Sequence, residues 1–152
     1  EMVRLGIGLY GVDSSGKQPE RLQTVGTLKT VISQIKHLKK GETVGYGRRG
    51  VADRDMTMAT VAIGYADGFN RGFGNGNAQV LINGQLASTI GSICMDMTMI
   101  DITGVDAREG DEVVVIGSEV SVESLAQKID TIPYEILTSI GERVKRVFYR
   151  ES

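Results

Sequence analysis

The strongest constraint on the fold is an Asn-Gly pair at residues 83 and 84. Segments rich in apolar residues flank the pair, Gln79–Ile82 before it and Gln85–Thr89 after it. Asn-Gly is typical of a type I′ turn, because both central residues of that turn have a positive φ. The pair therefore predicts an antiparallel hairpin, and it indicates a chain built at least in part from antiparallel strands.

Several other apolar segments also have the composition of strands. In Leu22–Leu38 strand and helix periods compete, but the β-branched residues predict one or two strands. Twenty glycines agree with many turns rather than long helices. Further strands are predicted at Met58–Ile63, Ile90–Ile102 and Glu112–Ile116, with Val144–Tyr149 as a closing strand. The residues thus predict a mainly β fold.

Two short helices are predicted near the C-terminus. Ser121 is a candidate N-cap, and Pro133 suits the first turn of a second helix. The apolar residues of the first helix fall on one face: Val122, Leu125, Ala126 and Ile129. No second domain is required by a length of 152 residues.

Charge and rare residues exclude several classes of partner. A formal net charge of −2, with only the short basic cluster Lys36–Lys40, predicts no binding to nucleic acid or to a membrane surface. One cysteine, Cys94, and one histidine, His37, are too few for a disulfide or a structural zinc site, so we expect no metal. The absence of a long apolar run leads us to expect a cytoplasmic protein.

Considered without reference to any protein family, the residues form no complete set of catalytic groups. Polar residues interrupt apolar segments at Arg4, at Tyr46 between two glycines, and at Tyr65. Each has an ordinary structural explanation: a strand-end arginine reaching solvent, a turn tyrosine covering the core, or a residue before an Asp-Gly turn. Cys94 and Met95 are equally explained as core residues.

These residues belong to five short runs in a fixed order. The runs are Arg4–Ile7 with Tyr10-Gly11, Gly41–Gly47, Ile63–Gly68, Cys94–Asp96, and Thr131–Glu135 with Arg143-Val144. In these runs the chain resembles the alanine racemases that depend on pyridoxal 5'-phosphate, over nearly its whole length.

The resemblance implies a fold and a division of the chain. In that family a (β/α)₈ barrel precedes a β-domain, and two chains pair head to tail so that each active site takes residues from both. Residues 1–12 would be a remnant of the last barrel strand, covering Val3–Tyr10, residues 13–21 a linker, and residues 22–152 the C-terminal β-domain. That domain is a small, barrel-like β structure with two short C-terminal helices. The barrel lysine that holds the cofactor is not in this chain.

The resemblance also implies cofactor contacts. Arg4 matches the arginine that hydrogen-bonds the pyridine nitrogen, where a permanent cation keeps that nitrogen unprotonated. Gly6 and Ile7 match positions whose backbone N–H groups approach the phosphate, although small residues in a packed strand explain them equally well. Tyr65 matches a tyrosine near the phosphate or substrate region.

Catalytic and substrate contacts follow from the same resemblance. Tyr46 matches the tyrosine that moves the α-proton on the substrate face opposite the lysine, since racemisation needs a base on each face. Met95 matches a residue whose backbone meets the substrate carboxylate. The implied entrance corridor consists of Tyr65, Asp67, Arg71 and Asp96.

Three places depart from the commonest pattern of the family. Ser92 stands where many members have an arginine, and Glu142 where a number of members have a tyrosine. Residues 47–50 also differ from the small and aromatic residues expected after the catalytic tyrosine. These differences suggest a sub-branch and leave the role implied for Tyr46 unchanged.

We therefore expect the C-terminal part of an alanine racemase that interconverts L- and D-alanine for peptidoglycan synthesis. Cofactor is not expected on the chain alone, and the chain alone is expected to be inactive. A serine racemase or a racemase of broad specificity is an alternative, and so, from another class, is a free-standing β-barrel interaction module.

Overall fold

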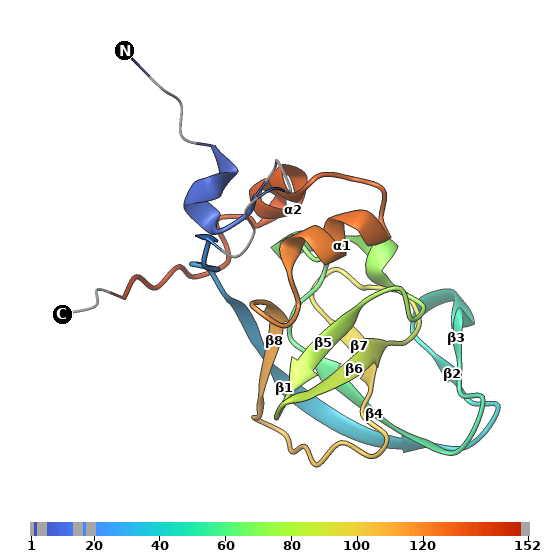
Figure 1. Cartoon of the computed structure of the whole chain (residues 1–152). Coiled ribbons are helices and arrows are strands. Elements are labelled where there is room, and N and C mark those ends of the chain that lie inside the picture. Colours follow the sequence, from blue (N-terminus) through green and yellow to red (C-terminus); the bar gives the residue numbers. More distant parts are fainter. Residues whose placement is uncertain (1, 3–5, 14–16, 18–20, 150–152) are drawn as a thin grey trace.

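Six antiparallel strands close a barrel in the order β1-β4-β7-β6-β5-β8 (Figure 1). The computed structural model describes residues 2, 6–13, 17 and 21–149. The barrel strands are β1 (Leu28–Leu38), β4 (Met56–Val61), β5 (Gln79–Ile82), β6 (Gln85–Thr89), β7 (Thr98–Asp101) and β8 (Glu112–Ile116). A separate two-stranded sheet pairs β2 (Thr43–Val44) with β3 (Gly50–Val51). The predicted mainly β, barrel-like fold is confirmed.

The predicted hairpin forms with the predicted boundaries. Asn83 has φ 48° and Gly84 has φ 78°, the two positive values that a type I′ turn requires. The register then pairs Val80 with Ala87 and turns both side chains into the core. Local turn chemistry thus sets the hairpin, and the Asn83 side chain also donates to the Asp106 carbonyl at 2.9 Å and to Asp111 Oδ2 at 3.0 Å.

Strand β1 closes the barrel, because it pairs with two different neighbours along its length. Residues 28–31 pair with β8, and the residues from Ile32 onward pair with β4. A register shift between Ile32 and Gln34 separates the two halves. Such a bulge bends a strand, which lets an 11-residue strand turn from one neighbour to the next.

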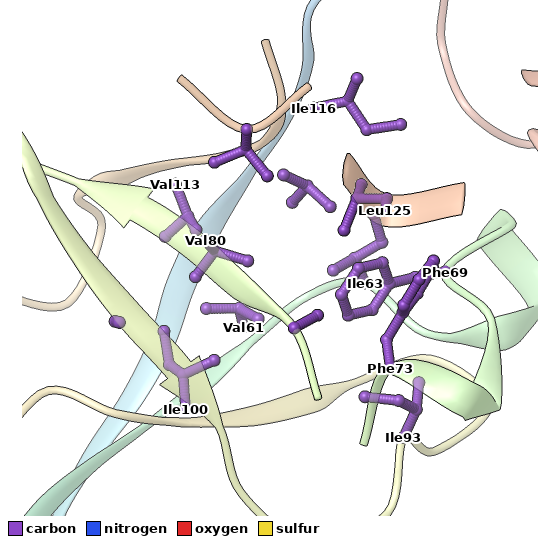
Figure 2. Close-up of a cluster of buried hydrophobic side chains, with 14 of the residues drawn as sticks. Val61, Ile63, Phe69, Phe73, Val80, Ile93, Ile100, Val113, Ile116 and Leu125 are labelled. Atoms are coloured by element: carbon purple, nitrogen blue, oxygen red, sulfur yellow. The ribbon is translucent and has the colours of Figure 1, made fainter. Parts of the chain in front are cut away.

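The core fills the barrel and continues beneath the C-terminal helices (Figure 2). Val61, Val80 and Val113 are fully buried between the strands. Phe69 and Phe73 pack with ring centroids 4.9 Å apart. Apolar burial of this kind is the main stabilising contribution to a domain of this size.

The two predicted helices are confirmed as α1 (Val122–Lys128) and α2 (Pro133–Ser139). The Ser121 side chain caps α1 by accepting a hydrogen bond from the Ser124 N–H at 3.2 Å. Both helices lie across one end of the barrel (Figure 1).

Short 3₁₀ helices are η1 (Ile7–Tyr10), η3 (Tyr46–Arg48), η4 (Tyr65–Asp67) and η5 (Arg71–Phe73). Within the described part of the chain, no helix is both long and apolar enough to cross a membrane.

The closing strand predicted at Val144–Tyr149 is wrong. No strand forms there, and Phe148 and Tyr149 are 89% and 91% exposed. The physical reason is that β8 already pairs with β1, so the barrel has no free edge for another strand.

The strand predicted at Val3–Tyr10 is also wrong over its second half, where the chain forms η1. Residues 3–5 lie outside the described residues. Glycines at 6, 8 and 11 and the lack of a partner strand favour a turn, and Gly11 ends it with φ 84°.

In the predicted strand Ile90–Ile102 only β7 is regular. The residues before it form a loop, residues 92–97, that carries Cys94, Met95 and Asp96.

Candidate functional site

Two loops far apart in the sequence lie side by side and carry several of the predicted site residues. The Tyr65 N–H donates to the Cys94 carbonyl at 3.0 Å, and the Ala66 N–H donates to the Met95 carbonyl at 3.0 Å. Loop 64–68, which follows β4, is thereby fixed to loop 92–97, which precedes β7. Tyr65 and Met95 remain 46% and 53% exposed, so both stand at the surface where the loops meet.

Gly64 permits this close approach. A Cβ at residue 64 would overlap the carbonyl oxygens of both Cys94 and Met95. Any other residue would therefore push the two loops apart. The glycine before Tyr65 has a packing role that the sequence pattern alone did not reveal.

Asp67 holds the turn that presents Tyr65. One carboxylate oxygen accepts a hydrogen bond from the Gly64 N–H at 2.9 Å, and the other pairs with Arg143 Nε at 3.0 Å. The Asp67 side chain is only 14% exposed. The structure thus gives Asp67 a local structural role, beside the corridor role that the resemblance implies.

Arg143 also reaches the second loop. Its Nη2 donates to Asp96 Oδ1 at 2.6 Å. The hydrogen bond to Asp96 and the charge of Asp67 raise the pKa of the Arg143 guanidinium above its ordinary value. Arg143 belongs to the last run of the sequence resemblance but was not predicted as a site residue, because its partners lie far away in the sequence.

Tyr46 projects from a tight turn between β2 and β3. Its side chain is 79% exposed. Gly45 has φ 73°, and a Cβ at this residue would lie 3.0 Å from the Met99 side chain and within 3.8 Å of the Ser92 backbone, so the base of the turn lies beside loop 92–97. A tyrosine in this position presents its hydroxyl to the outside of the domain rather than to the core.

Gly6 and Ile7 lie at the start of η1, against α2. The Ile7 N–H donates to the Tyr134 hydroxyl at 2.9 Å. A Cβ at residue 6 would overlap the same hydroxyl. One backbone N–H and one hydroxyl, both of which are groups that can donate to a phosphate oxygen, thus lie side by side here. Arg4 lies outside the described residues.

Tyr134 was not predicted as a site residue. It falls within a run that carries the sequence resemblance, Thr131–Glu135, which is the only signal that could have identified it.

Arg71 does not join this group. It opens η5 on the surface, and no ion pair to Asp67 or Asp96 is formed by it in the described part of the chain. Ser92 is half-buried and Glu142 is exposed. Cys94 is buried, with its thiol 3.7 Å from the Ser92 carbonyl oxygen.

An open hollow of about 290 Å³ lies between β3 and the barrel. It contains Arg49 and Arg54 but none of the predicted site residues. Arg54 is neutralised by Asp53 at 2.8 Å and Asp101 at 2.7 Å.

Within the described ranges, no three His, Cys, Asp or Glu side chains gather closely enough to hold a metal ion.

The chain matches the family described as "Alanine racemase, C-terminal domain" over residues 25–148. It is 41% identical over 155 residues to the alanine racemase of Helicobacter acinonychis (strain Sheeba), and 42% identical over 159 residues to that of Clostridium novyi (strain NT). These matches cover 97% and 99% of this chain but 41% of each relative.

Solved structures give the same result. The biosynthetic alanine racemase of Pseudomonas aeruginosa has a TM-score of 0.89 at 33% identity, over 95% of this chain and 41% of that one. The alanine racemase of Bartonella henselae with covalently bound pyridoxal phosphate also has a TM-score of 0.89, at 39% identity, over 95% of this chain and 40% of that one. The chain spans about two fifths of the length of the relatives it matches. It belongs to the alanine racemase C-terminal domain family.

Proposed function

We propose that this chain is the C-terminal domain of an alanine racemase and that Tyr46 is one of its two catalytic bases, delivered to the active site of a partner subunit. The observation that carries the proposal is the position of Tyr46, which is 79% exposed on a turn that lies beside the loop that bears Met95. An exposed tyrosine on a turn that lies against its own domain is suited to act as a base in the active site of another chain.

The proposal assigns residues 1–12 to the end of the catalytic barrel, residues 13–21 to a linker and residues 22–152 to the β-domain. Two such proteins would pair head to tail as a homodimer, in the cytoplasm. Since the matched part of each relative is about two fifths of its length, the remaining length is expected to supply the barrel and its lysine.

Pyridoxal 5'-phosphate, when bound, supplies an electron sink that makes the α-hydrogen of an amino acid acidic. In this chain the Gly6 and Ile7 N–H groups would face its phosphate, together with the Tyr134 hydroxyl that already meets Ile7. Arg4 would donate to the pyridine nitrogen and keep that nitrogen unprotonated. Tyr65 would lie close to the phosphate or substrate.

Toward the substrate, Tyr46 would take or return the α-proton on the face opposite the barrel lysine. The Met95 backbone would meet the alanine carboxylate, and Tyr65, Asp67, Arg71 and Asp96 would line the approach. The relative from Clostridium difficile 630 has been solved in complex with cycloserine. A serine racemase or a racemase of broad specificity is the alternative within this class, because a base that moves the α-proton does not select the side chain of the substrate.

The test uses a chimaera in which this chain replaces the matching part of the Pseudomonas aeruginosa racemase. Because the two enantiomers have equal free energies, any variant must lose kcat/KM equally in both directions. Exchange of the α-hydrogen with deuterium from D₂O separates the two bases. We expect Tyr46→Phe to reduce racemisation by about 10²- to 10⁴-fold. It should abolish exchange of one enantiomer and leave exchange of the other.

Tyr149→Phe is the control, since that side chain is 91% exposed and has no proposed role. Racemisation and two-sided exchange at near-normal rates in Tyr46→Phe would disprove the catalytic assignment. The unmodified chain alone, incubated with cofactor and alanine, is expected to give no D-alanine above a boiled control.

A further inference from the structure

Arg143 joins two carboxylates that belong to different loops. Asp67 lies in loop 64–68, with Arg143 Nε at 3.0 Å, and Asp96 lies in loop 92–97, with Nη2 at 2.6 Å. The bond to Asp96 spans 47 residues of sequence. A guanidinium suits this task because its planar fork offers separate N–H groups to two acceptors.

The ion pairs reinforce a junction that backbone hydrogen bonds also hold. Between the two loops the backbone contributes the bonds from Tyr65 to Cys94 and from Ala66 to Met95. Asp67 in turn holds the Gly64 N–H, so its position is transmitted to the start of loop 64–68. Arg143 therefore strengthens the place at which Tyr65 and Met95 are mounted.

The contact between the two loops depends on the positive charge of Arg143, because each loop contributes a negatively charged aspartate. Asp67 is 14% exposed, and its charge is compensated by Arg143. Without the guanidinium the two carboxylates would repel each other across the junction, and the more buried one would lose its ionic partner. The expected consequence is separation of the loops rather than unfolding of the barrel, whose strands these residues do not form.

We propose that Arg143 is a positioning residue that fixes Tyr65 and Met95 relative to each other, and so shapes the substrate entrance and the carboxylate end of the site. The functional half of this statement rests on the proposed function. The structural half concerns this chain alone.

Arg54 provides a matched control. It also bridges two aspartates, Asp53 and Asp101, at 2.8 and 2.7 Å, and its exposure of 53% is close to the 51% of Arg143. It pairs with Asp101 at the end of β7 that is opposite to loop 92–97. Replacing Arg54 also removes an arginine that bridges two aspartates, but at a different place in the fold.

The first test is hydrogen–deuterium exchange on this chain. In Arg143→Met we expect the Tyr65 and Ala66 amides to exchange faster by about three- to tenfold, while amides of β5 and β8 keep their rates. In Arg54→Met the Tyr65 and Ala66 amides should keep their rates. Unchanged exchange in Arg143→Met, or equal acceleration in Arg54→Met, overturns the proposal, whether or not the chain serves a racemase.

Milder variants keep the test decisive if Arg143→Met disturbs the whole fold. Asp96→Asn removes one carboxylate and retains the ion pair between Arg143 and Asp67. Arg143→Lys retains the positive charge, but a single ammonium group is less suited than a guanidinium to bind both carboxylates at once. Both are expected to accelerate the same two amides by a smaller factor than Arg143→Met. Wild-type protection in both variants counts against a positioning role.

The second test is kinetic and uses the chimaera. Because Arg143 does not carry the α-proton, Arg143→Met should raise KM for alanine by about tenfold while kcat changes less than it does in Tyr46→Phe. A fall in kcat at constant KM contradicts positioning of the substrate. If Tyr46→Phe proves harmless, the proposed function fails, and the exchange experiment still decides the structural half.

Discussion

Thr98 is one of two buried polar side chains in the described part of the chain, and its hydroxyl has a specific partner. It donates to the Ile63 carbonyl at 2.7 Å, immediately before loop 64–68. In the Thr98→Val variant, the Ile63 carbonyl would remain buried and would lose this hydrogen-bond donor. We expect the free energy of unfolding in urea to fall by about 1–3 kcal/mol. Thr43→Val, at an exposed strand position, should change it by less than about 0.5 kcal/mol.

Asp101 gives a prediction for pH dependence. Burial raises its pKa, but hydrogen bonds from the Thr103 hydroxyl and amide and the Arg54 guanidinium outweigh burial, so the pKa is lower than usual. A carboxyl with a lowered folded-state pKa stabilises the fold above its unfolded pKa and loses that contribution as pH falls.

Asp101→Asn should therefore reduce the free energy of unfolding by about 1–2 kcal/mol at neutral pH. The difference from wild type should shrink as the pH falls below about 4, the ordinary pKa of an aspartate. Urea titrations across this range measure it, with the exposed Asp53→Asn as control. A difference that stays constant over the whole range would contradict the assignment.

Single site residues were predictable to different degrees. The glycines on either side of Tyr46 were enough to indicate a turn, and the structure places the tyrosine on one. The contact between Arg143 and Asp96 was not predictable, because it spans 47 residues and depends on how β7 is placed in the barrel. Tyr134 was missed for a related reason, since its hydroxyl meets a residue 127 positions away.

Among the elements, helix α1 offers a direct test of local capping. The Ser121 side chain accepts a hydrogen bond from the Ser124 N–H at 3.2 Å. Ser121→Ala should lower the free energy of unfolding by about 1 kcal/mol. Thermal and urea denaturation measure this. Ser118→Ala serves as the control, because the Ser118 hydroxyl donates to the side chain of its neighbour Glu119 and caps no helix. Equal losses in the two variants would show that the cap contributes nothing specific.

The elements predicted correctly are those specified by nearby residues. The hairpin has the predicted limits because Asn83 and Gly84 determine its turn, and α1 begins where Ser121 caps it. The strand predicted at Val144–Tyr149 failed because strand propensity cannot reveal that β8 and β1 already close the sheet. Loop 92–97 was predicted as strand because its buried residues, Ile93 and Cys94, resemble those of a strand interior.

At the level of the whole molecule, the barrel acts as a scaffold on which site residues stand at the surface. Tyr46 is 79% exposed and Tyr65 is 46% exposed, although both are presented by ordered turns. The barrel core can account for stability, but it does not account for these exposed tyrosines. A shared active site between two subunits would account for both.

Mixed dimers test this central claim most directly. One chimaera carries Tyr46→Phe, and a second carries an intact Tyr46 with the cofactor lysine of its barrel replaced. Each should be inactive alone. If Tyr46 serves the partner's site, a mixed dimer contains one complete site, and random mixing should restore about a quarter of the wild-type racemase activity. If mixing restores no activity although mixed dimers form, Tyr46 does not act across the interface, and the account is wrong.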